Sequence, residues 1–424
     1  MLDQSLVHLI TIPLFTGVIG YVTNWSGVLM LFAPLRFHGV RIPGLKTLFP
    51  LLPRRIQQIP AITADGKLGW QGIVPSRAEK MASIAVDKSL AKVGSIADFY
   101  RVLDPDTVAE HLVAVSQREV RGIVARIMEA ENPQLWHNLP DSVRELVYQR
   151  VESNLPADVR KVTSRIESNI DDFIDAKLMV IRHLSANPAL LNDIFRTMGA
   201  KELRFMQNFG FYFGFPMGFV LVGVLEFVPE WWVLPVGGVI IGYVVNYLGM
   251  RMIFEPAEPS RLVPWRQALF LKRRGEIADG YSKTMAEHVI TLENIGTELL
   301  EGPRSDRTRR MLDEVLGGSV NEAAGWARSV VRMTVGTESY ERIPALAAAE
   351  VIEFSPKVYA DEDFSARQAE KIRVFVAERM STLDNKEFGE LLRAAVKQDE
   401  WLLFVHGAVL GSVAGFIHLA IFGV

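Results

Sequence analysis

Four long apolar segments dominate what this chain can fold into. They run from about Leu6 to Phe32, Phe209 to Val228, Trp232 to Phe254 and Trp401 to Val424. Each is long enough to cross the hydrocarbon core of a bilayer, which takes about 20 apolar residues in a helix. Because a crossing segment must satisfy its own backbone hydrogen bonds, it folds as a helix. The sequence therefore predicts an all-α membrane protein with four transmembrane helices.

A cleavable signal peptide is the alternative interpretation of the first segment. The segment lacks a basic region in front of it and an obvious cleavage site between small residues. Arg36 and Arg41 follow it at once. We therefore expect it to remain as a span.

Basic residues gather on one side of the expected spans. The other side offers Asp3, Glu226 and Glu230, with no lysine or arginine. The positive-inside rule then places both long inter-span segments in the cytoplasm and both termini outside. The basic residues are Arg36, Arg41, Lys46, Arg54, Arg55, Arg196, Lys201, Arg204, Arg251, Arg261, Arg266, Lys272, Arg273 and Arg274.

Composition and motifs argue against several functions. The net charge of −3 does not favour nucleic-acid binding, and the absence of cysteine excludes disulfides and thiolate metal sites. The phosphate-binding GxxxxGK[ST], the zinc-binding HExxH and the nucleophile GxSxG are all missing. We therefore expect a protein that is not an enzyme and has no catalytic residues, no metal and no cofactor.

The chain repeats part of itself. Residues Ile19–Asn24 recur as Ile241–Asn246, at an offset of 222. Later matches fall at an offset of 197: Arg77 and Glu79 match Arg274 and Glu276, and the glycines of the second and fourth spans match each other. The difference indicates an insertion of about 25 residues in the first copy, between Pro34 and Arg77, which we expect at the membrane interface.

Each copy then reads as a span, a cytoplasmic arm of amphipathic helices and a second span. Both copies cross the membrane in the same sense, so they are parallel repeats that a pseudo-twofold axis along the membrane normal can relate. The expected segments are a first span at 1–32, an insert and first arm at 33–205, a transmembrane hairpin at 206–254, a second arm at 255–400 and a last span at 401–424.

Glycines spaced for close helix packing lie in all four spans. Small residues four apart let two helix backbones approach in a membrane, so we expect these glycines at helix contacts. They are Gly20, Gly242, Gly210, Gly214, Gly218, Gly407, Gly411 and Gly415.

The arms show helical periodicity without sustained alternation, so strands are expected only as short pieces. Ser76-x-x-Glu79 resembles a capping box, one helix begins near Pro140, and a long one spans Val159 to Ile181. Asn187-Pro188 should break it, with Gly199 ending the next helix. The apolar stripes either pack together in a bundle or face lipid.

Asn24 and Asn246 occupy equivalent positions in the first and third spans. Polar groups inside a span are costly, so both are candidates for a polar ligand site, with Thr23, Tyr21 and Tyr243 nearby. An interhelical hydrogen bond is the structural alternative.

Several motifs resemble a bacterial membrane family. Ile19-Gly20-Tyr21-x-Thr23-Asn24-Trp25, Met30-Leu31-Phe32-x-Pro34, Gln71-Gly72-Ile73-x-Pro75-x-Arg77 and Gly199-x-x-Glu202-Leu203 look like the hallmark of the domain of unknown function 445, the YheB/YjiN-like group. The resemblance implies a multi-pass protein of the bacterial inner membrane and supplies no activity. In the second copy Val245 replaces the threonine, and the Gln-Gly-x-x-Pro element is expected to be lost.

Two functions remain open. The first is a non-enzymatic protein whose cytoplasmic arms bind membrane lipids or a protein partner, in envelope organisation or lipid handling. Gln71, Gly72, Pro75 and Arg77 would then lie where the first arm leaves the membrane, with Arg77 suited to a lipid phosphate, unless the element is only a turn and helix cap. The second is a small-solute transporter with its site near Asn24 and Asn246. A homo-oligomer is compatible with both.

Overall fold

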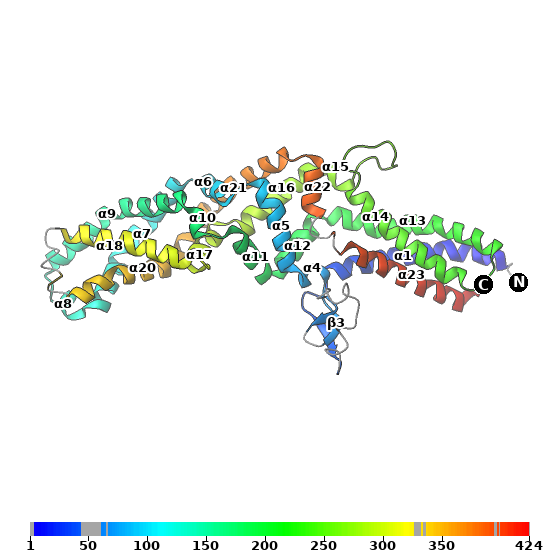
Figure 1. Cartoon of the computed structure of the whole chain (residues 1–424), viewed down its shortest axis with the longest axis horizontal. Helices are drawn as coiled ribbons and strands as arrows, with labels where there is room; N and C mark the ends of the chain where they lie inside the picture. Colours follow the sequence, from blue (N-terminus) through cyan, green and yellow to red (C-terminus); the bar gives the residue numbers. More distant parts are fainter. Residues whose placement is uncertain are drawn as a thin grey trace. The chain divides into compact units, whose positions relative to one another are not determined.

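A computed structural model describes residues 4–43, 61–64, 67–325, 332–333, 336–393, 397 and 399–423, most of them helical (Figure 1). The chain divides into two compact units, and each draws residues from both halves of the sequence. The span unit comprises Met1–Ser89, Ile181–Tyr281 and Met380–Val424, and the bundle unit comprises Leu90–Val180 and Ser282–Arg379.

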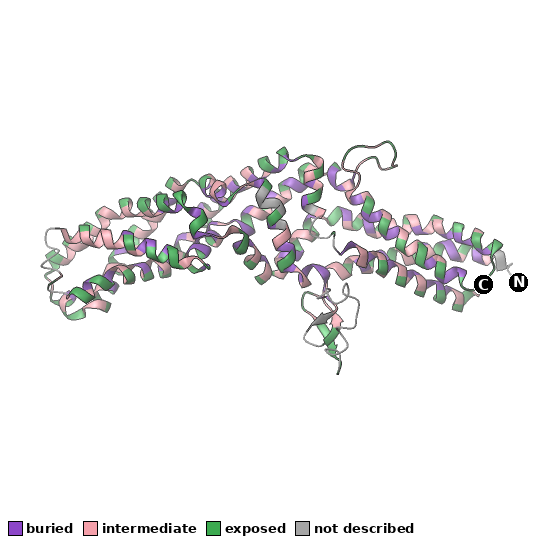
Figure 2. Ribbon diagram, in the orientation of Figure 1, coloured by how far each residue is buried: buried purple, intermediate pink, exposed green. Residues whose placement is uncertain are grey.

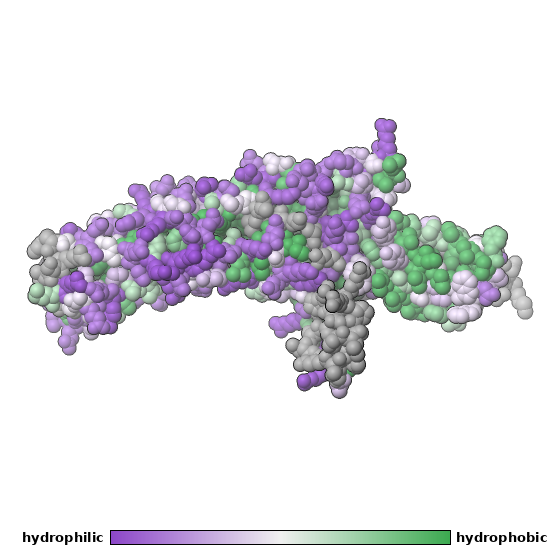
Figure 3. Space-filling view, in the orientation of Figure 1, coloured by the Kyte–Doolittle hydropathy of each residue, from purple (hydrophilic) through white to green (hydrophobic). Residues whose placement is uncertain are grey.

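The span unit contains the four helices that are long and apolar enough to cross a membrane. They are α1 (Gln4–Phe32), α13 (Ala200–Phe227), α14 (Val233–Phe254) and α23 (Glu400–Phe422). The prediction of four spans is confirmed, although α13 begins nine residues before the apolar segment from which it was predicted. Apolar side chains cover these helices on the outside, where lipid would lie (Figure 3).

The four spans pack as two pairs, α1 against α13 and α14 against α23. Within each pair the backbones touch through glycine. A Cβ atom built on Gly20 would overlap the carbonyl oxygen of Gly210, and one on Gly242 would overlap that of Gly407. Gly214, Gly218, Gly411 and Gly415 also lie against the backbone of the facing helix. The glycine positions therefore bring the helix axes of each pair close together.

A small antiparallel sheet follows the first span, with strand order β1-β3-β2. Short helices that lie wholly or partly in the span unit complete it. The bounds are β1 His38–Arg41, β2 Thr63–Ala64, β3 Lys67–Trp70, α4 Ile73–Ser76, α5 Ala78–Val93, α11 Ala176–Ala186, α12 Pro188–Met198, α15 Leu269–Lys272, α16 Arg274–Thr284 and α22 Asn385–Arg393.

The bundle unit is built on four long helices, α7 (Pro105–Glu131), α9 (Asp141–Ser168), α18 (Ser305–Ala324) and α20 (Thr337–Tyr359). Each arm contributes two, and they interleave: α7 packs on both α9 and α20, and α18 packs on both α20 and α9. Buried residues line the inside of this unit (Figure 2). The other elements are α6 Ile96–Val102, α8 Pro133–Asn138, α10 Ile170–Phe173, η2 Met285–Val289, α17 Leu292–Glu301 and α21 Glu362–Thr382.

Ion pairs join the helices of different arms in this bundle. Arg126 pairs with Glu350 at 2.6 Å, and Lys357 pairs with Glu119 at 3.0 Å, both between α7 and α20. Such exposed pairs contribute little to stability individually, so the apolar contacts around Ile127 and Ile343 hold the bundle together.

Two expectations about the arms are wrong. The helix expected to start near Pro140 and the one expected from Val159 are a single helix, α9, which continues through Pro156. It ends at Ser168, well before Ile181. The expected break at Asn187-Pro188 and the helix end at Gly199 are confirmed.

Ser76 is not a helix cap. It is the last residue of α4, and its hydroxyl donates to the carbonyl oxygen of Ile73 at 2.9 Å. The capping box lies further on, where Ser95 and Asp98 bond reciprocally at the start of α6. The Ser-x-x-acid pattern occurs at both places, and only at the second does the serine stand directly before the first residue of a helix.

Candidate functional site

Asn24 and Asn246 make equivalent hydrogen bonds between paired spans. The Asn24 Nδ2 atom donates to the carbonyl oxygen of Met206 at 2.6 Å, and the Asn246 Nδ2 atom donates to that of Leu403, also at 2.6 Å. The donors are 222 residues apart and the acceptors 197, the two offsets of the internal repeat. Each asparagine thus joins the two spans of its own copy, a contribution of roughly 1 kcal/mol in a membrane.

The two asparagines do not bond to each other, but both line one cavity among the four spans. This acidic cavity has a volume of about 110 Å³. Its walls are apolar, and its polar groups are the two asparagine amides and three carboxylates. The lining residues are Asn24, Gly27, Val28, Leu31, Phe32, Ile73, Met81, Phe195, Met198, Gly199, Glu202, Leu203, Met206, Asn246, Met250, Ile253, Phe254, Phe270, Asp399, Glu400 and Leu403.

A second cavity of about 50 Å³ lies deeper among the spans, and Asn24 lines both. Its lining includes Gly20, Thr23 and Gly242. The Oδ1 atom of Asn24 is buried and has no hydrogen-bond partner among the described residues. A buried carbonyl without a partner is unfavourable, so this atom is available to a donor inside the cavities.

The three carboxylates of the acidic cavity are buried and each is paired with an arginine. Glu202 accepts from Arg273 at 2.6 and 2.7 Å, Asp399 pairs with Arg77 at 3.1 Å, and Glu400 accepts from Arg393 at 2.8 Å. Burial raises the pKa of Asp399, and the charge of Arg77 opposes that shift. Removing any one of these three arginines would leave a buried carboxylate without its paired charge.

Two of these pairs are equivalent and cross between the repeats. Glu202 and Asp399 are 197 residues apart, and Arg77 and Arg273 are 196 apart. Arg77 lies after the first span and pairs with Asp399, just before the fourth span. Arg273 lies after the third span and pairs with Glu202, in the second span. Each of these two ion pairs therefore joins the two halves of the sequence.

The expected match of Arg77 with Arg274 is displaced by one residue. Arg77 and Arg273 both directly follow a four-residue helix, α4 or α15, and have nearly the same backbone angles, φ −123° and −112°. Arg274 instead donates to Asn385 at 3.3 Å and to the carbonyl oxygen of Ser381 at 3.0 Å. The Arg-x-Glu pattern shared by both places misaligned them.

The element around Gln71 is not lost in the second copy, contrary to expectation. The Gln71 Nε2 atom donates to the carbonyl oxygen of Leu35 at 2.8 Å, and Gln267 donates to that of Ala257 at 3.1 Å. The next residues, Gly72 and Ala268, donate their backbone N–H groups to Pro34 and Pro256 at 2.9 and 3.0 Å. These bonds close the turn after each first span.

The remaining candidates are scattered. Pro75 is buried in α4, and neither it nor Arg77 lines either of these two cavities. Tyr21 and Tyr243 are 40% and 45% exposed and line neither cavity. Tyr243 packs instead against Tyr247 and Phe404. Of the predicted ligand residues, the structure brings together Asn24, Asn246 and Thr23.

Sequence reasoning missed the buried carboxylates. Glu202 was quoted only as part of a motif, and Asp399 and Glu400 were not singled out. The available signal was an acidic residue at the start of both the second and the fourth span. Within the described ranges, no group of three side chains is placed to hold a metal ion.

Comparison with known proteins finds bacterial relatives over a short stretch. The chain is 35% identical over 68 residues to a UPF0754 membrane protein of Geobacillus kaustophilus, covering 15% of this chain and 18% of that protein. It is 31% identical over 96 residues to one of Exiguobacterium sibiricum, covering 22% and 24%, and 39% identical over 66 residues to one of Bacillus thuringiensis, covering 15% and 18%.

These matches span about a fifth of the length of the relatives. No family model matches the chain, and no solved structure does. The similarity to the domain of unknown function 445 stays a prediction. The relatives and the four apolar helices together identify the chain as a membrane protein similar to uncharacterised bacterial membrane proteins.

Proposed function

We propose that this protein is a non-enzymatic membrane protein of two parallel copies that binds a phospholipid at its acidic cavity, with part of the lipid inside. Its helical arms lie in the cytoplasm and bind lipid or a protein partner. The acidic cavity is the observation that carries the proposal: apolar walls among four spans end at buried ion pairs. A cavity of about 110 Å³ takes only part of a lipid: its apolar walls suit a segment of an acyl chain, and its charged end suits a headgroup.

The charges favour a zwitterionic headgroup. Three carboxylates line this end, and Arg77, Arg273 and Arg393 pair with them from outside the lining. Arg273 and Arg393 also bind Glu276 and Glu255, which pair in turn with Lys201 and Arg251, so this network of five acids and five bases is close to neutral. A free anion would have to displace a carboxylate from its arginine. A zwitterion such as phosphatidylethanolamine offers an ammonium to the carboxylates and a phosphate to the guanidinium groups, so it adds no net charge. Arg77 would therefore bind the lipid phosphate while it remains paired with Asp399.

Filling the cavity should expel the lipid. A Cβ atom on Gly27 would lie 3.5 Å from the Leu403 side chain, an ordinary contact, so Gly27→Leu extends into the cavity without overlapping backbone. We expect the wild type to retain phosphatidylethanolamine through purification in mild detergent, and Gly27→Leu to lose it in native mass spectrometry.

The matched control is Gly223→Leu, because a Cβ on Gly223 meets nothing within 4 Å. It should retain the lipid. Equal retention by all three proteins would contradict the proposal. A polar solute that co-purifies with wild type and is lost on Asn24→Ala would favour the transporter instead, since the Asn24 Oδ1 atom is the buried group awaiting a donor.

The cytoplasmic placement of the arms is tested by cysteine labelling, because the chain has no native cysteine. Trp231→Cys, in the exposed turn between α13 and α14, should react with an impermeant maleimide added to intact cells. Leu146→Cys, exposed on α9, should react only after lysis. The reverse pattern would overturn the orientation.

A further inference from the structure

The sheet that follows the first span has one apolar face and one basic face. In the antiparallel register Val40 lies opposite Leu68, and Arg41 lies opposite Lys67. Because side chains alternate along a strand, the two pairs point to opposite faces. Val40 is 74% exposed and Leu68 is 42% exposed, so the apolar face is open to its surroundings.

The basic pair of Arg41 and Lys67 is suited to binding an anion. Like charges directly opposite each other destabilise a sheet. Among the described residues, neither Arg41 nor Lys67 has an acidic partner. The stretch 35–70 contains six basic residues and a single acidic one. An anion between the two side chains would relieve their repulsion.

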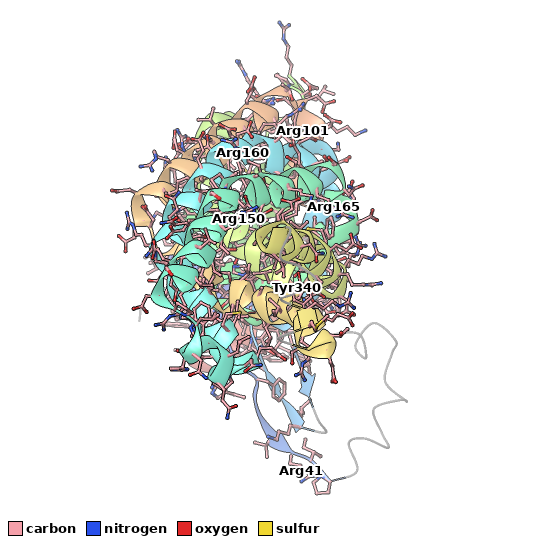
Figure 4. The ribbon with its side chains drawn as sticks, turned by 90° about the vertical axis from the view of Figure 1, so that its left-hand side faces the viewer. Arg41, Arg101, Arg150, Arg160, Arg165 and Tyr340 are labelled. Carbon is pink, nitrogen blue, oxygen red and sulfur yellow. The ribbon has the colours of Figure 1, made fainter. Side chains whose placement is uncertain are left out.

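The position of the sheet identifies the source of that anion. His38 is six residues beyond the end of α1, a distance of about 20 Å at full extension. Within the span unit the sheet projects sideways, across the direction of the spans, and Arg41 lies toward its free end (Figures 1 and 4). A sideways projection at the end of a transmembrane helix lies along the membrane surface.

The second copy places a similar element after its own first span. The loop 257–266 carries Leu262, which is 94% exposed, between the exposed Arg261 and Arg266. It projects from the span unit on the side away from the sheet (Figure 1). Both copies therefore present an apolar side chain beside basic ones at the same level of the spans.

We propose that the sheet and the 257–266 loop are two membrane-surface anchors that insert Val40, Leu68 and Leu262 among the headgroups and bind anionic lipid phosphates through the adjacent basic residues. The anionic cytoplasmic leaflet attracts such basic clusters, and the apolar side chains gain burial. The bilayer in which the spans lie is the occupant, and the anchors extend its contact with the protein sideways.

The test uses the full-length protein reconstituted into vesicles of phosphatidylcholine with and without phosphatidylglycerol. Val40→Cys carries an environment-sensitive fluorophore, quenched by lipids brominated near the headgroup. We expect strong quenching in the anionic vesicles and the same for Leu262→Cys. Leu146→Cys, on the bundle unit, is the water-exposed reference.

Removing charge should weaken the docking selectively. Adding Arg41→Gln to the labelled protein should lower the docked-to-undocked ratio about fivefold in anionic vesicles, the effect of one basic residue at such a surface. A Val40 label as accessible to water as the Leu146 label would overturn the proposal. So would protection of Val40 that appears only when soluble cell protein is added.

Discussion

Replacing Arg273 by glutamine is expected to lower the free energy of unfolding by about 3–5 kcal/mol, because it leaves a buried carboxylate without its partner. Glu202 is 4% exposed and accepts two hydrogen bonds from Arg273. The loss should appear as an earlier midpoint when the purified protein is unfolded in mixed detergent micelles with increasing dodecyl sulfate.

Two further variants separate the buried charge from general damage. Glu202→Gln combined with Arg273→Gln removes both charges and should recover most of the loss. Lys201→Gln removes the neighbouring ion pair with Glu276. The Lys201 side chain is 64% exposed and that of Glu276 is 54% exposed, so this variant should change the midpoint little. If the double variant is as unstable as Arg273→Gln alone, Glu202 is not the source of the effect.

The equivalent change in the other copy adds a dependence on pH. Burial already raises the pKa of Asp399, and Arg77→Gln removes the charge that opposes that shift. A carboxyl group with a raised pKa in the folded state stabilises the fold at low pH and loses that contribution as pH rises. The deficit of Arg77→Gln should therefore shrink as the pH is lowered toward the ordinary carboxyl value of 3.8.

The spans and the place of their glycines at helix contacts were accessible from sequence because hydropathy and glycine spacing are local patterns, whereas which spans pair was not predicted. The four helices were predicted from apolar length, and the offsets of 222 and 197 coincide with the Asn24 and Asn246 hydrogen bonds. Sequence patterns do not reveal an equivalent element when only its backbone turn, and not its residue types, is the same. Gln267 makes the hydrogen bond equivalent to that of Gln71 although Ala268 replaces Gly72. The two glutamines are 196 residues apart rather than 197, so the match was missed in the sequence.

The charged end of the cavity was beyond sequence reasoning for a different reason. Two of its three pairs, Arg77 with Asp399 and Arg273 with Glu202, join residues from different halves of the sequence. No periodicity encodes such a contact. The first arm also does not fold on its own half alone, since α7 packs on α20 as well as on α9. The interleaving of the copies is therefore a tertiary property.

The glycine contacts within the two span pairs are testable side by side. Gly20→Leu is expected to force α1 and α13 apart, because its Cβ alone would overlap the Gly210 carbonyl oxygen. Gly242→Leu is expected to do the same to α14 and α23, through Gly407. Overpacking of this kind costs about 1–3 kcal/mol and sometimes more, and here the obstacle is backbone that cannot change rotamer.

The unfolding midpoint in mixed micelles measures the loss, and Gly223→Leu on α13 is again the matched control, since it adds the same side chain where a Cβ meets nothing within 4 Å. Midpoints that coincide for Gly20→Leu and Gly223→Leu would show that the helices do not touch there.

The two span pairs should respond separately. Because α1 packs mainly on α13 and α14 mainly on α23, Gly20→Leu and Gly242→Leu are expected to add in the double variant. A double variant no worse than either single one would mean that both pairs separate together, and the ion pairs that cross between the copies would then be the coupling to examine.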